Sequence, residues 1–88
     1  MFVVVSYDIS SPSAGNRARK LCEAYLRRIQ KSVYEGEISE KKLGILKAKL
    51  CSAVRSGEDS VIVYRFSPTG YPFRESHGGR VLNEDEFI

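Results

Sequence analysis

The sequence contains only two cysteines and one histidine, and it has no long hydrophobic run. Cys22 and Cys51 lie far apart and form no C-x-x-C pair, so the ligand spacing of a zinc site is absent. We expect both to be buried thiols that pack as small apolar side chains. The longest apolar run, residues 2–5, is far too short to cross a membrane, and no charged leader precedes it. These features predict a cytoplasmic protein without disulfides and without membrane contact.

The length of 88 residues allows one domain with a single modest core. Apolar residues make up 42% of the chain and charged residues 28%, as in ordinary globular proteins. The net charge is +3, but residues 1–31 hold six lysines or arginines and only two acids, whereas Glu84, Asp85 and Glu86 stand near the end. This uneven distribution favours a polyanionic partner at one surface and a protein contact at another.

Hydrophobic patterning predicts strands at residues 2–8 and 59–66 and helices at residues 13–27 and 39–55, the second helix capped by Ser39. Between the helices, residues 27–38 are extended, either as one bent strand or as a tight hairpin, with Gly36 at a bend or bulge. This order predicts an α+β, ferredoxin-like (βαββαβ) fold, an antiparallel sheet with both helices on one face. The domain is expected to cover residues 1–67, with residues 68–88 as a C-terminal tail.

The outer strands are apolar on both of their faces. Along the first strand, Phe2 and Val4 alternate with Val3, Val5 and Tyr7, and along the last strand, Ile62, Tyr64 and Phe66 alternate with Val61 and Val63. Helices can cover only one face, and a face exposed to water should be polar. We therefore expect a homodimer packed sheet to sheet about a two-fold axis. The alternative is that a few of these side chains are simply exposed to solvent.

Asp8 ends the first apolar strand, where a carboxylate costs both strand propensity and desolvation. An aspartate before Ser-Ser-Pro-Ser is commonly a turn former or a helix cap. In a sheet-to-sheet dimer, two copies of Asp8 would approach and repel each other, which a divalent cation or a shared proton relieves. A carboxylate suits magnesium or manganese with several waters. No histidine or lysine is evidently placed as a general base, and His77 is expected to be a solvated loop residue.

Four segments together resemble the CRISPR-associated protein two family. Its members are the small partner in the bacterial and archaeal spacer-acquisition complex. A strand ends in Tyr-Asp, an Asn-Arg pair opens the first helix, a Gln-x-Ser-Val-aromatic-Glu segment follows, and an Asp-Ser-Val strand closes the fold. Here these are "VVVSYDIS", "NRARK", "RRIQKSVYEGEI" and "EDSVIVYRF", in that order over residues 1–66. After Ser67 the resemblance is loose.

The resemblance implies a ferredoxin-like homodimer in which Asp8 lies at the interface and binds a divalent metal, Mg²⁺ or Mn²⁺. It also implies metal-dependent endonuclease activity on single-stranded RNA or double-stranded DNA, with Asp8 as the catalytic residue. In spacer acquisition the dimer bridges two copies of the CRISPR integrase protein. Residues 80–82 are the candidate for a C-terminal strand that adds to the partner protomer.

Five basic residues are the expected nucleic-acid contacts. They are Arg17, Lys20, Arg27, Arg28 and Lys31. At about 100° per residue, a helix over residues 13–27 places Arg17, Lys20 and Arg27 on one side, opposite its apolar stripe. The alternative is an ordinary solvated helix face. Tyr7 and Tyr34 either stack on bases or pack in the core or an interface.

The sequence therefore predicts a dimeric nuclease of CRISPR adaptive immunity that hydrolyses phosphodiesters at a paired Asp8 site with the help of magnesium. The alternative is a non-catalytic scaffold that binds a DNA duplex along its basic helices and holds the integrase at a fixed spacing. A third possibility is a toxin-type ribonuclease of similar fold.

Overall fold

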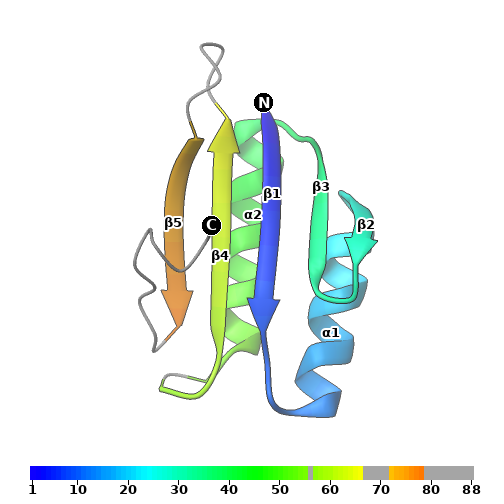
Figure 1. Cartoon of the computed structure of the whole chain (residues 1–88), viewed down its shortest axis with the longest axis vertical. Helices are drawn as coiled ribbons and strands as arrows, with labels where there is room; N and C mark the ends of the chain where they lie inside the picture. The colour runs from blue at the N-terminus through cyan, green and yellow to red at the C-terminus, as the bar shows by residue number, and fades with distance from the viewer. Residues whose placement is uncertain (56, 67–71, 79–88) are drawn as a thin grey trace.

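The computed structural model describes residues 1–55, 57–66 and 72–78, the last of these without their side chains. The elements are β1 (Phe2–Asp8), α1 (Pro12–Glu23), β2 (Arg27–Gln30), β3 (Val33–Glu37), α2 (Glu40–Ala53), β4 (Ser60–Phe66) and β5 (Pro72–Gly78). The strands form one antiparallel sheet in the order β2-β3-β1-β4-β5. Both helices lie behind this sheet, on one face (Figure 1). The predicted α+β fold with a βαββαβ core is confirmed.

The core forms between the sheet and the apolar stripes of the two helices. In α2, Leu43, Leu46 and Leu50 recur at spacings of three and four and are buried. In α1, Ala18 and Cys22 face the same core. The Ser39 hydroxyl accepts a hydrogen bond from the Lys42 backbone N–H at 3.2 Å, which confirms the predicted cap of α2.

The two cysteines have different environments. Cys22 is buried as predicted, and burial raises the pKa of its thiol to about 12, so it stays protonated at neutral pH. Cys51 is exposed, so the prediction of a buried thiol there was wrong. Its position follows Leu50 directly, one step outside the apolar stripe, and the helix therefore turns it towards solvent.

The first helix is shorter than predicted. It begins at Pro12 after the cap Ser11 and ends at Glu23, where the Leu26 backbone N–H donates to the Cys22 carbonyl at 2.8 Å and the chain turns. The extended segment that follows is a hairpin, not one bent strand, because β2 pairs antiparallel with β3. The register of this strand pairing shifts between Arg28 and Gln30 on β2, and not at the predicted position, Gly36.

A fifth strand extends the sheet beyond the predicted core. β5 pairs with β4 of the same chain over residues 72–78, from Phe66↔Pro72 to Ser60↔Gly78. The sequence did not predict a strand here, where glycine and polar residues dominate. The strand expected at residues 80–82 lies outside the described residues, and so does any pairing of that segment with a partner.

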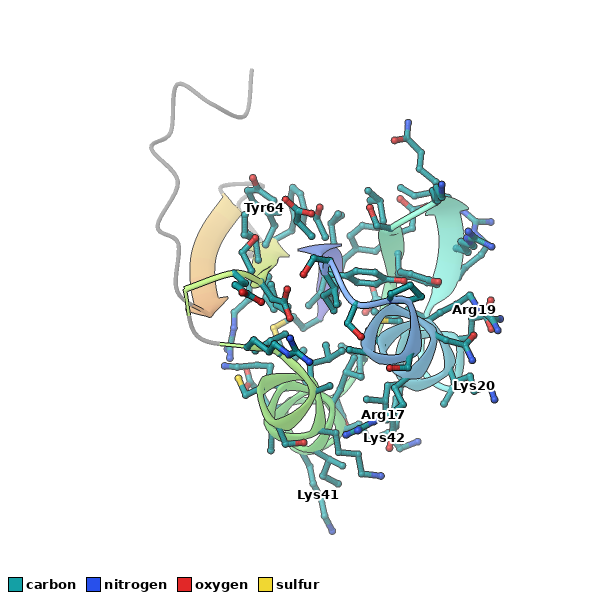
Figure 2. The ribbon with its side chains drawn as sticks, turned by 90° about the horizontal axis from the view of Figure 1, so that it is seen from below. Arg17, Arg19, Lys20, Lys41, Lys42 and Tyr64 are labelled. Atoms are coloured by element: carbon teal, nitrogen blue, oxygen red, sulfur yellow. The ribbon has the colours of Figure 1, made fainter. Side chains whose placement is uncertain are left out.

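The sheet face opposite the helices is apolar along β1 and β4. Strand pairing sets Phe2 beside Phe66 and Val4 beside Tyr64 on this face. The rings of Phe2 and Phe66 meet edge to face, with centroids 5.8 Å apart. Figure 2 shows Tyr64 projecting from the sheet on the side away from both helices. Ile62 shares the face, so the predicted two-sided apolar pattern is confirmed for both strands. Hereafter this is called the open sheet face.

Candidate functional site

A cavity of about 410 Å³ opens where β1 ends, between the start of α1 and the turn that joins β2 to β3. Asp8 is the only acid among the described residues that line it, and three cations share the lining: Arg19, Arg28 and Lys31. Asp8, Arg28 and Lys31 were predicted as site residues from the sequence, whereas Arg19 was not. The fold thus brings one carboxylate and three cations from separate segments to one cavity.

Asp8 is the last residue of β1 and lies opposite Ser60 of β4. Side chains alternate along a strand, so Asp8 follows Phe2, Val4 and Ser6 on the open sheet face. It is exposed, unlike the buried Val3 and Val5 of the same strand. Asp8 therefore lies where the cavity meets the open sheet face.

The arginines of the cavity are held in place by local hydrogen bonds. Arg19 donates to the Asn16 side-chain carbonyl at 2.7 Å and to the Glu23 carboxylate at 3.0 Å, both one turn away on α1. Arg28 donates to the backbone carbonyls of Gln30 at 3.3 Å and Lys31 at 3.1 Å. These bonds orient two planar guanidinium groups, which suit bidentate contact with phosphate oxygens.

The two tyrosines near the site pack within the protein. The ring of Tyr7 stacks on that of Tyr34, with centroids 6.0 Å apart and planes 19° apart, and Tyr34 is fully buried. Burial, followed by the neighbouring Tyr34, raises the pKa of the Tyr7 hydroxyl above its ordinary value. Tyr34 is therefore a core residue, and Tyr7 forms a wall of the cavity as a neutral phenol.

Asp59 is a buried residue that the sequence interpretation did not single out. Its carboxylate accepts hydrogen bonds from the backbone N–H of Arg55 at 2.9 Å and of Ser10 at 3.1 Å, and from the Ser10 hydroxyl at 3.3 Å. It thereby ties the loop that follows Asp8 to the loop that precedes β4. The available signal was an aspartate in the loop between a helix and a strand, six residues after Ala53 and directly before β4, a common place for side-chain bonds to the backbone.

The backbone N–H groups of Arg55 and Ser10 lower the pKa of the Asp59 carboxyl below its ordinary value of 3.8. A carboxyl with a lowered folded-state pKa stabilises the fold fully above its unfolded value and loses that contribution as the pH falls through the folded value. We expect Asp59→Asn to lower the thermal midpoint at neutral pH and to differ less from the unsubstituted chain as the pH falls below 3.8. Thermal unfolding across this range, with exposed Glu58→Gln as control, measures the effect. A difference that does not change with pH would contradict it.

The other predicted contacts lie elsewhere. Arg17 and Lys20 line a groove of about 450 Å³ between α1 and α2, together with Lys49. Arg27 does not join them, because α1 ends at Glu23 and Arg27 belongs to β2. There it donates to Glu35 across the strand pair at 2.7 Å. The expectation that Arg27 lies on a helix face with Arg17 and Lys20 was therefore wrong, and the five predicted contacts occupy three separate places.

Asp8 fits a magnesium or manganese site better than a zinc site. Within residues 1–55 and 57–66, no three His, Cys, Asp or Glu side chains gather as a closed ligand set would require. Magnesium, however, is commonly held by one or two carboxylates with water as the remaining ligands. An exposed carboxylate beside a cavity provides one of these.

Over the described residues, no helix is both long enough and apolar enough to span a membrane. The helices α1 and α2 contain 12 and 14 residues.

Comparisons with known proteins agree on one family. The family model described as "CRISPR associated protein Cas2" matches residues 1–71. The CRISPR-associated endoribonuclease Cas2 of Fusobacterium nucleatum is 37% identical over 92 residues, which cover 100% of this chain and 87% of the relative. The CRISPR-associated endonuclease Cas2 of Halalkalibacterium halodurans is 32% identical over 84 residues, 90% of this chain and 86% of the relative. The crystal structure of Streptococcus pyogenes Cas2 is similar with a TM-score of 0.70 at 28% identity, over 76% of this chain and 87% of that one.

Proposed function

This chain belongs to the CRISPR-associated Cas2 family, and on that basis we propose that it is a dimeric, metal-dependent endonuclease that hydrolyses RNA or DNA in spacer acquisition. One observation carries the proposal: an exposed carboxylate, Asp8, borders a cavity where the other charged side chains among the described residues are all cations. Such a site suits a divalent metal at the carboxylate and a polyanionic substrate at the cations. Relatives named as endoribonuclease and as endonuclease support internal cleavage of a nucleic acid, and the first of these names supports RNA as a substrate class.

The open sheet face is the proposed dimer interface. It presents Phe2, Val4, Tyr64 and Phe66, all half-buried within one chain, over the central strand β1 and its neighbour β4. Two copies that pack these faces together would cover an apolar surface that the helices cannot reach. Asp8 shares this face at the end of β1, so a two-fold axis near that end would bring two Asp8 carboxylates together.

The Asp8 carboxylates of the two protomers are proposed to hold Mg²⁺ or Mn²⁺. When bound, such an ion supplies Lewis-acid polarisation of a phosphodiester and makes an attacking water more acidic. The protein positions the substrate: Arg19 and Arg28 present oriented guanidinium groups, and Lys31 adds a third positive charge at the same cavity. Contacts of this kind neutralise and orient phosphate oxygens without reading the base sequence.

Cleavage assays on single-stranded RNA and on double-stranded DNA, with Mg²⁺ and with Asp8→Asn beside the unsubstituted chain, test the proposal directly. Loss of cleavage in the variant supports it. Cleavage at the original rate in the variant would place the activity elsewhere.

A second function, as a scaffold that bridges two copies of the CRISPR integrase protein, is supported by a separate observation. Arg17 and Lys20 lie outside the Asp8 cavity, on the helix layer, where they would bind DNA whether or not cleavage occurs. For both functions we propose a cytoplasmic location.

A further inference from the structure

The groove between α1 and α2 has positive charges that no described acid compensates. Arg17 and Lys20 of α1 and Lys49 of α2 border it, and all three are exposed. Figure 2 shows Arg17 and Lys20 projecting from α1 on the side away from the sheet. Within residues 1–55 and 57–66, none of the three cations has an ion pair. The groove therefore attracts a negatively charged group.

Most acids of the chain are already engaged elsewhere. The chain has 11 acids, and every acid within residues 1–55 and 57–66 already interacts with another part of the chain. Glu75 is held in the middle of β5, where it pairs with Val63. The acids that remain, Glu84, Asp85 and Glu86, follow one another near the end of the sequence. They are the residues for which the sequence predicts a protein contact.

The lining of the groove is apolar as well as basic. Leu21 and Tyr25 line it too, and each is half-buried, packing on the core while part of its surface stays open. Phe87 and Ile88 directly follow the three acids in the sequence. An acidic segment that continues into two large apolar residues matches both parts of this lining, whereas a nucleic-acid backbone would use only its cations.

The acidic segment begins close enough to reach the groove. Gly78, the last residue of β5, lies opposite the first residue of β4. Just before β4, the Asp59 backbone N–H donates to the Arg55 carbonyl at 3.0 Å, and Ser52, three positions before Arg55, lines the groove. Residues 84–88 are 6 to 10 positions beyond Gly78. An extended chain of that length spans roughly 20 to 36 Å.

We propose that residues 84–88 bind in the groove of their own chain, with the carboxylates at Arg17, Lys20 and Lys49 and the apolar pair over Leu21 and Tyr25. These five residues lie outside the part of the chain that the structure describes. The contact is reversible, because exposed ion pairs are individually weak and are screened by salt. It covers two cations that the scaffold function assigns to DNA, so the segment competes with DNA. That consequence rests on the proposed function.

Zero-length carbodiimide crosslinking of the full chain, without nucleic acid or metal, tests the docking. The reagent joins a carboxylate to a lysine amine only where the two groups are in contact. We expect the acids of residues 84–86 to be joined to Lys20 or Lys49, and not to Lys41, an exposed lysine of α2 outside the groove lining. The yield should fall at about 1 M salt, where the Debye length is about 3 Å.

Isotope labelling shows which chain supplies the segment. Labelled and unlabelled chains are refolded together in equal amounts, and the crosslinked peptides are identified by mass spectrometry. Crosslinks without mixed pairs support docking within one chain, and mixed pairs would overturn it in favour of the partner protomer's segment. No crosslink at Lys20 and Lys49, or an equal yield at Lys41, would also overturn the proposal.

A variant without any charge change separates docking in the groove from general attraction. Phe87→Ser with Ile88→Ser keeps all three carboxylates and removes the apolar pair. It should lower the crosslink yield at Lys20 and Lys49, because the contact with Leu21 and Tyr25 is lost. An unchanged yield would contradict binding in the groove.

The competition with DNA is measured separately. Replacing the acids of residues 84–86 by their amides should raise the affinity for a short duplex at low salt by about tenfold, as expected for three weak exposed pairs. The gain should disappear in a Lys20→Gln, Lys49→Gln background and persist in a Lys41→Gln, Lys42→Gln background. Equal gains in both backgrounds would overturn the competition. The expected crosslinks with an unchanged DNA affinity would support the docking and contradict the proposed DNA contact of the helix layer. The amide variant is Glu84→Gln, Asp85→Asn, Glu86→Gln.

Discussion

Replacing Asp8 by asparagine is expected to reduce metal-dependent cleavage at least about a hundredfold. Loss of an outer hydrogen-bond partner of a metal ligand already costs up to about 100-fold in affinity or activity, so loss of the ligand's charge should cost no less. The substitution is nearly isosteric, and Asp8 is exposed at a strand end, so the fold should be unaffected. Initial rates on single-stranded RNA and double-stranded DNA, with and without Mg²⁺, measure the effect.

Asp59→Asn is the matched control, because Asp59 is the neighbouring aspartate that serves the loop and not the cavity. It should lose stability while keeping Mg²⁺-dependent cleavage at temperatures where it is folded. Wild-type cleavage rates in Asp8→Asn would contradict the assignment. If Asp8→Asn loses cleavage yet still binds DNA and supports spacer integration, the scaffold is the main physiological function and cleavage is a separate activity.

A negative charge on the open sheet face should convert the proposed dimer to a monomer. Tyr64→Asp or Val4→Asp would bury a carboxylate in each half of an apolar interface, and each buried ion costs several kcal/mol. Two such ions per dimer correspond to more than roughly a thousandfold weaker association, at 1.4 kcal/mol for each factor of ten. Analytical ultracentrifugation of the two variants measures this weakening, and using both positions guards against a local folding defect in either.

Ala48→Asp provides the control, since it adds the same charge at an exposed position of α2 on the far side of the molecule. It should leave the dimer intact. Retention of the dimer in Tyr64→Asp and Val4→Asp, with a far-ultraviolet spectrum like that of the unsubstituted chain, would show that the chains associate through another surface.

Most of the fold could be predicted because its elements have strong local patterns. The spacing of Leu43, Leu46 and Leu50 determines which side of α2 is buried, and the strands are β-branched and aromatic on both faces. The end of α1 was predicted too late, because apolar residues at 25 and 26 continue the helical spacing after the helix has ended. β5 was missed because its glycine and polar residues show no strand pattern. Pairing with β4 stabilises this strand although its local propensity is low.

The site was predictable in part. Asp8, Arg28 and Lys31 were identified, and the fold brings them to one cavity. Arg19 was not predicted as a site residue. Its side chain reaches the cavity because of where α1 begins and because it bonds to Asn16 and Glu23, and a single sequence reveals neither. The lysines of α2 became part of a basic surface only when α2 packed beside α1, a tertiary contact that no local pattern indicates.

The stoichiometry of Mn²⁺ binding is the most direct test of a metal site shared by two Asp8 carboxylates across the open sheet face. Titration followed by electron paramagnetic resonance should find one Mn²⁺ for every two chains, and none bound at the same concentrations in Asp8→Asn or in monomeric Tyr64→Asp. One ion per chain, or unchanged Mn²⁺ binding by the monomer, would contradict a shared site.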